Sequence, residues 1–168
     1  MHYAEDKFVP FVARRRLQPH CRFSCRMRFD PQGTESAGIA VVQAMNHQIH
    51  LQLARENGER KLQLLLFTAD YALPPYIPGF TSETKRRVIA EVPWAGGDIV
   101  LRMELNGNDY RFSYGADEAH LTELGSVDGA LINPEKVGCM VGEMLGMFAT
   151  GNGADSDKRA LFSWAEYS

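Results

Sequence analysis

Cysteine is scarce in this 168-residue sequence, which has three, at positions 21, 25 and 139. An odd number excludes a complete set of disulfides. Cys21 and Cys25 lie four residues apart in a segment with the pattern of a strand, which separates their Cα atoms by about 13 Å. A disulfide needs about 7 Å or less, so the two cannot pair within that strand. We therefore expect reduced thiols in the core, where unpaired cysteine is most often found.

Long apolar runs are also missing. No stretch of the sequence approaches the roughly 18 apolar residues that cross a bilayer. The first six residues, Met1–Asp6, are acidic where a signal peptide would be basic and then apolar. The sequence therefore predicts a cytoplasmic chain with no membrane partner. The net charge of −3 likewise argues against a nucleic-acid partner.

Helical periodicity is weak, and alternation with a period of two dominates. Cys21 to Phe29 alternates apolar and polar residues over nine positions, which is typical of a strand with one buried face. Ile49–Leu53 and Lys61–Phe67 flank Asn57-Gly58, a pair that favours a tight hairpin turn. Ala37–Gln43 is a continuous apolar run, which indicates a strand buried on both faces.

The same pattern recurs in the second half of the chain. Further strands are expected near Arg87–Trp94, Ile99–Leu105, Tyr110–Tyr114, Met144–Thr150 and Ala160–Tyr167. About nine to eleven short strands separated by turns predict an all-β protein, a two-sheet antiparallel β-sandwich or jelly roll. We expect an N-terminal extension over residues 1–10 and a single sandwich domain over residues 11–168.

Residues that carry chemistry are few. A glycosidase needs two carboxylates that face each other about 5 Å or about 6.5–9.5 Å apart. The inward positions of the expected strands are aliphatic or aromatic, and Glu91 and Glu104 fall on polar faces. No Gly-x-Ser-x-Gly motif is present, and Cys139 has no histidine at a spacing that suggests a dyad. We therefore predict no catalytic residue, no cofactor and no cluster of metal ligands.

The segment Gly151–Asp157 alternates amide and acidic oxygens. A loop rich in turn-forming residues is one interpretation. A structural calcium ion near Asp155 and Asp157 is the other, although the loop lacks the bidentate glutamate of an EF-hand.

Basic residues are concentrated near the N-terminus. Arg14, Arg15 and Arg16 are followed by three further arginines on one face of the 21–29 strand. That face lacks the interleaved aromatics of a nucleic-acid site, so we interpret it as solvated or covered by another domain. Arg14, Arg15 and Arg16 are the candidate interface residues, and the long segment 68–85 is a second candidate for a covered surface.

Two aromatic residues are candidates for a sugar platform. The rings of Trp94 and Tyr110 would each stack on the apolar face of a pyranose. A core position is the alternative for Tyr110, because Tyr110, Phe112 and Tyr114 alternate along one expected strand.

Several segments, taken in order, resemble one known family. They are Phe11–Arg16, Ala37–Val42, Asp109–Tyr114, Leu145–Gly153 and Ala160–Tyr167. Each motif is modest alone, but their order and spacing resemble the C-terminal concanavalin A-like, lectin-like domain of glycoside hydrolase family 43, especially its β-xylosidase members.

The resemblance implies a sandwich that packs on a five-bladed β-propeller. In the family, the propeller holds the catalytic Asp and Glu residues of an inverting mechanism. A sandwich loop leans over its pocket, and the corresponding segment here is Val137–Gly142. Cys139 and Met140 are then the pocket-closing candidates, where the family has an aromatic residue.

The function that follows is that of a non-catalytic accessory domain. We expect it to pack on a propeller, in cis or on a partner subunit, and to shape a pocket for xylo- or arabino-oligosaccharides. The alternative is a free-standing carbohydrate-binding, lectin-like module.

Overall fold

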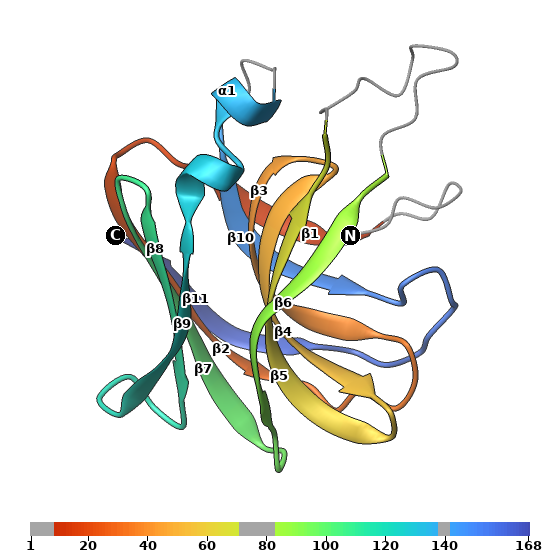
Figure 1. Ribbon diagram of the computed structural model, residues 1–168. Helices are drawn as coiled ribbons and strands as arrows, with labels where there is room; N and C mark the ends of the chain where they lie inside the picture. Colours follow the sequence, from red (N-terminus) through yellow and green to blue (C-terminus); the bar gives the residue numbers. More distant parts are fainter. Residues whose placement is uncertain (1–8, 71–82, 138–141) are drawn as a thin grey trace.

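The chain folds into two antiparallel β-sheets that pack face to face (Figure 1). The computed structural model describes residues 9–70, 83–137 and 142–168. Within these ranges there are eleven strands, one 3-10 turn and one four-residue helix. The predicted all-β, two-sheet sandwich is confirmed.

The larger sheet has six strands and is on the right in Figure 1. In spatial order they are β1 (Phe11–Arg15), β10 (Met144–Thr150), β3 (Ser36–Ala44), β4 (His47–Glu56), β5 (Glu59–Thr68) and β6 (Lys85–Pro93). The hairpin between β4 and β5 turns at Asn57 and Gly58, whose φ angles are 53° and 83°. Asparagine and glycine adopt such positive φ values most readily, which is why this dipeptide marked the turn.

The smaller sheet has five strands. In spatial order they are β11 (Leu161–Tyr167), β2 (His20–Arg28), β7 (Asp98–Asn106), β8 (Asp109–Gly115) and β9 (Leu121–Asp128). After β9 the chain forms the 3-10 turn η1 (Gly129–Leu131) and the helix α1 (Pro134–Val137) at the top of Figure 1. No helix in the described part of the chain is long and apolar enough to cross a membrane.

The core lies between the sheets and is built by the alternation in the strands. On β2, Cys21, Phe23, Cys25 and Met27 point inward with exposures of 8 % or less. Cys21 and Cys25 are unpaired, as expected. Burial raises the pKa of the Cys25 thiol to about 12, so this side chain is a neutral apolar group at physiological pH.

The middle of the six-stranded sheet is buried on its outer face as well. β3 is buried along most of its length, as the apolar run predicted. On β4, the polar residues Gln48, His50 and Gln52 alternate with core residues and are 1 %, 1 % and 7 % exposed. The ring of His50 packs between Phe67 and Phe148, with centroid distances of 4.8 and 4.6 Å. This outer face is therefore a second packed layer and contains several polar groups.

Candidate functional site

Arg16, Tyr110 and Glu143 form a polar cluster at the end of the sandwich that carries α1. Arg16 Nη1 donates to Glu143 Oε2 at 2.8 Å and to the Tyr110 hydroxyl at 2.6 Å. That hydroxyl in turn donates to Glu143 Oε1 at 2.6 Å. The other guanidinium nitrogens of Arg16 donate to the carbonyl oxygens of Gln18, Pro19 and Gly107. The cluster thus ties β1, β8 and the start of β10 together.

The surroundings of Arg16 and Tyr110 shift the pKa of both groups upward. Burial and the hydrogen bond to Glu143 hold the pKa of the Tyr110 phenol far above its usual value. Burial of Arg16 acts to lower its pKa, but the hydrogen bond to Glu143 and the Coulombic attraction of nearby groups raise it overall. Neither group exchanges a proton near neutral pH, so the cluster is suited to anchoring chain segments rather than to acid–base chemistry.

The structure separates the three candidate interface arginines. Arg14 and Arg15 are exposed on β1, and the Arg14 guanidinium lies 4.7 Å from the centroid of the Tyr167 ring. Arg16 has a side chain only 14 % exposed, with its donors taken by the cluster. The interpretation of Arg16 as an interface residue therefore needs correction, because its guanidinium has no free edge to offer a partner.

The two sugar-stacking candidates also differ. Tyr110 is 2 % exposed in the core, so neither face of its ring is accessible to a sugar, and this candidate is corrected to a core residue. Trp94 is partly exposed. It packs edge-on to Tyr114, with a centroid distance of 6.4 Å, and borders a cavity of about 560 Å³ together with Arg55 and Arg60. Trp94 remains a candidate.

Two carboxylates approach each other on the outer face of the six-stranded sheet. Gln63 Nε2 donates to Glu56 Oε2 at 2.7 Å and to Glu91 Oε2 at 3.0 Å. Glu91 also accepts from Lys61 Nζ at 2.6 Å. Hydrogen bonds from Lys61 and Gln63 lower the pKa of Glu91, whereas a glycosidase acid requires a raised one. Glu91 is therefore arranged to accept hydrogen bonds rather than to donate a proton.

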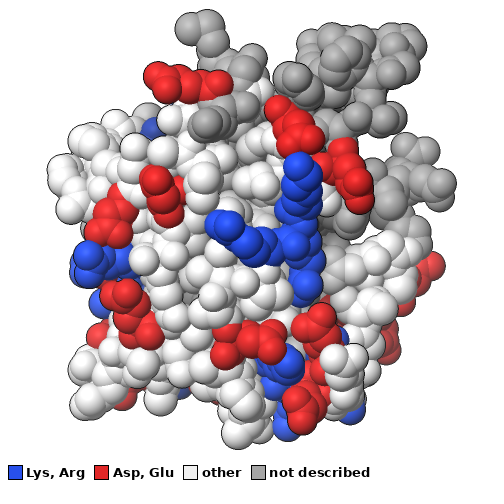
Figure 2. Space-filling view, viewed as in Figure 1, with Lys and Arg blue, Asp and Glu red and all other residues white. Residues whose placement is uncertain are grey.

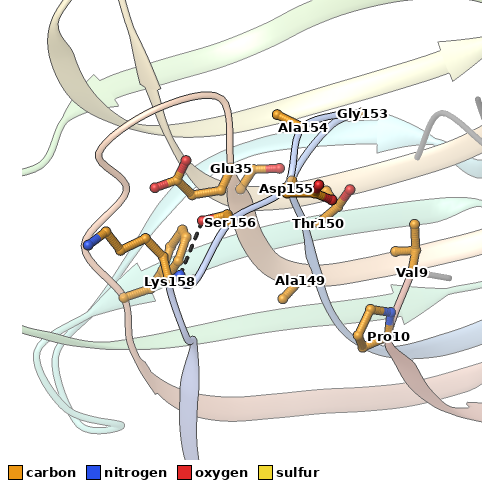
Figure 3. Close-up of a pocket in the computed structure, with 13 residues that line it drawn as sticks. Val9, Pro10, Glu35, Ala149, Thr150, Gly153, Ala154, Asp155, Ser156 and Lys158 are labelled. Atoms are coloured by element: carbon orange, nitrogen blue, oxygen red, sulfur yellow. Dashed lines mark hydrogen bonds between the residues drawn. The ribbon is translucent and has the colours of Figure 1, made fainter. Parts of the chain in front are cut away.

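The 151–157 loop lines a cavity of about 350 Å³ (Figure 3). Glu35 on its wall accepts from the backbone N–H groups of Gln32 and Gly33 at 2.8 and 3.0 Å. Asp157 is exposed and lies 3.6 Å from Lys158 Nζ. Among the described residues, no group of three or more His, Cys, Asp or Glu side chains is placed to hold a metal ion. The calcium interpretation of Asp155 and Asp157 gains no support here.

The remaining basic residues are mostly paired. Two of the three arginines on the basic face of β2, Arg26 and Arg28, form ion pairs with Asp98, and the Arg26–Asp98 distance is 3.1 Å. On the face shown in Figure 2, basic side chains gather over β6, and acidic ones lie around them. There Lys85 pairs with Asp70 at 2.7 Å, and Arg86 lies 3.9 Å from Glu56. Charges of both signs alternate on these surfaces, unlike those of a nucleic-acid site.

The pocket-closing candidates Cys139 and Met140 lie outside the described residues, and so does most of the 68–85 segment. The Arg16 cluster and the polar outer face of β4 were missed by sequence reasoning. The alternation of Gln48, His50 and Gln52 was visible but was compatible with a solvated face. Glu143 carried no local signal, because its partners are far away in sequence.

Comparison with known proteins gives one consistent family. The β-xylosidase C-terminal concanavalin A-like domain matches residues 5–168. A non-reducing end α-L-arabinofuranosidase from Bacteroides ovatus is 25 % identical over an alignment of 169 positions, which covers 99 % of this chain and 29 % of that enzyme.

Solved structures agree on the fold. The GH43 protein BlXynB from Bacillus licheniformis has a TM-score of 0.78 and 20 % identity, over 94 % of this chain and 29 % of that one. A xylan β-1,4-xylosidase from Bacillus halodurans has a TM-score of 0.77 and 17 % identity, over 95 % and 30 %. The chain spans less than a third of the length of each of these relatives. The chain belongs to the family of β-xylosidase C-terminal concanavalin A-like domains.

Proposed function

We propose that this chain is the accessory sandwich of a family-43 glycosidase, which packs on a catalytic domain and shapes its substrate pocket. One observation carries the proposal. The match extends over 99 % of this chain but only 29 % of the arabinofuranosidase, so the remainder of that enzyme has no counterpart here. The chemistry of the described residues is consistent with this division, because the carboxylates brought together, Glu56 and Glu91, are held by hydrogen-bond donors.

The surface for the catalytic domain is proposed at β1 and the turn that follows it. β1 is an edge strand of the six-stranded sheet. Val12 and Leu17 are 69 % and 68 % exposed, and Arg14 and Arg15 lie between them. Exposed apolar residues flanked by arginine are typical of an interface. Because the Arg16 cluster fixes this segment to β8 and β10, the surface is held rigidly.

The substrate class of the assembled enzyme is proposed to be xylo- or arabino-oligosaccharides. This follows from the relatives, of which one is an arabinofuranosidase and one a xylosidase. In this assignment, the bonds are broken in the catalytic domain, and the sandwich limits the length of glycan that enters.

A hydrolysis assay on the isolated chain tests the proposal. Purified protein should release no p-nitrophenol from the aryl β-xyloside or the aryl α-L-arabinofuranoside, and no xylose from xylobiose. The variants Glu56→Gln and Glu91→Gln serve as controls. Turnover by the purified chain that disappears in either variant would show a catalytic sandwich and contradict the accessory role.

A further inference from the structure

A cavity of about 330 Å³ opens on the outer face of the six-stranded sheet. It lies where β4, β5 and β6 run side by side (Figure 1). Its walls include His50, Gln52, Gln63, Phe67, Arg86 and Asn152. The volume is within the range of small-molecule sites, about 300–1,000 Å³.

Buried polar groups line this cavity. Gln52 and Gln63 are 7 % and 1 % exposed, and both lie on its wall. The Gln63 amide is held in one orientation by its bonds to Glu56 and Glu91. His50 Nε2 is likewise fixed, 2.7 Å from Gln48 Oε1. Buried groups held this way are preorganised, so a ligand would not have to order them.

Apolar side chains also line the cavity. The Phe67 ring is partly exposed and lines the cavity beside Leu65 and Ala54. Its tilted contact with His50, at 4.8 Å between centroids, fixes the ring position. A cavity lined by both an aromatic ring and amide groups matches a ligand with one apolar face and a hydroxyl-bearing edge.

Three charged residues line the opening, Arg55, Glu56 and Arg86, and the Arg55 guanidinium is turned to Gln32, with Nη1 donating to Gln32 Oε1 at 3.4 Å. Arg86 Nη2 lies 3.9 Å from Glu56 Oε1, and both residues line the cavity. An anionic ligand attracted by Arg86 would also meet the Glu56 carboxylate, and a cationic one would meet the guanidinium. A neutral ligand whose hydroxyl groups both donate and accept can satisfy the two together.

We propose that this cavity binds one ring of a short neutral oligosaccharide. The ring lies against Phe67, and its hydroxyl groups bond to Gln52 and the Arg86–Glu56 pair. The proposal does not depend on the accessory role, because it concerns binding by this chain alone.

Titration calorimetry on the full chain tests the site, with xylotriose and α-1,5-arabinotriose as neutral probes and trigalacturonic acid as an anionic one. At least one neutral probe should bind. Arg86→Ala should weaken binding about tenfold or more, the loss expected for a hydrogen bond to a charged group. Arg87→Ala is the matched control: it removes the same charge from the adjacent residue of β6, which does not line the cavity, and should change the affinity less than about twofold. Gln52→Met should weaken binding without removing a charge.

Three results would overturn the proposal. One is the absence of heat with both neutral probes at about 10 mM, about ten times the Kd of a weak, 1 mM complex. Another is tighter binding of trigalacturonic acid than of both neutral probes. The third is an equal effect of Arg86→Ala and Arg87→Ala, which would place the ligand elsewhere. These three results come from binding measurements and do not depend on whether the chain hydrolyses a substrate. Failure of this site and failure of the accessory role can therefore be told apart.

Discussion

Arg16 and Glu143 form an ion pair of 2.8 Å across 127 positions of the sequence. Their side chains are 14 % and 9 % exposed. The backbone N–H of Arg16 also donates to the Glu143 carbonyl oxygen at 2.8 Å, so the two residues are joined twice. The pair fixes the segment that enters β10 to the segment that leaves β1.

Glu143→Ala should lower the free energy of unfolding by about 3 kcal/mol. The change leaves the largely buried Arg16 guanidinium and the Tyr110 hydroxyl without their acceptor, and breaking one partner of such a pair costs about 3–5 kcal/mol. Asp109→Ala is the control, because its 2.9 Å bridge to Arg111 is about half exposed and should contribute less than about 1 kcal/mol. Urea unfolding measures both. Equal losses in the two variants would contradict the anchoring role.

His50 should make stability depend on pH. Burial lowers its pKa well below 6.5, so the folded protein holds a neutral ring while the unfolded chain takes up a proton below that pH. The stabilising contribution is complete above pH 6.5 and is lost as the pH falls below it, by up to about 1.4 kcal/mol per pH unit. The urea concentration at the unfolding midpoint should therefore decrease between pH 7.5 and pH 5.5, and this decrease should be larger in the native chain than in His50→Leu.

The exposed His120 supplies the control for this experiment. Its side chain is 82 % exposed and contacts Asp117 at 2.9 Å. His120→Ala should retain the full loss of stability between the two pH values. If His50→Leu and His120→Ala show the same pH dependence, His50 is not the group responsible.

The two core thiols should be unreactive in the folded protein. Burial raises the pKa of both Cys21 and Cys25, that of Cys25 to about 12, so little thiolate is present at pH 8. A Cys139→Ser variant leaves only these two thiols to react. Labelling with Ellman's reagent at pH 8 should proceed about a hundredfold more slowly than in 8 M urea, because reaction requires opening of the core. Fast labelling without urea would show that β2 is accessible.

The sequence predicted the strands wherever alternation was strong. On β2, the period of two predicted which side chains face the core, and the structure buries those residues: Cys21, Phe23, Cys25 and Met27. β9 was not predicted, because of its residues only Val127 is buried and the pattern alternates poorly. An edge strand that covers little core carries little periodic signal.

The burial and the partners of the polar residues in the candidate sites could not be predicted from the sequence. His50 and Gln52 alternate with core residues as exposed side chains do, yet both are buried, and the His50 ring packs between Phe67 and Phe148. Tyr110 and Trp94 looked alike as aromatic strand residues. Only the fold shows that the Tyr110 hydroxyl bonds to Glu143 in the Arg16 cluster, whereas Trp94 lines a cavity. Partners distant in sequence, such as Arg16 and Glu143, leave no local pattern.

A reconstitution assay tests the accessory role most directly. The Bacteroides ovatus arabinofuranosidase is produced without the segment that matches this chain, and activity on the aryl arabinofuranoside is measured after addition of either its own segment or this chain. The account predicts that both additions form a complex and raise kcat/KM, and that Arg14→Glu with Arg15→Glu weakens the complex made by this chain. Restored activity with the enzyme's own segment, but neither complex nor rate increase with this chain, would contradict the account.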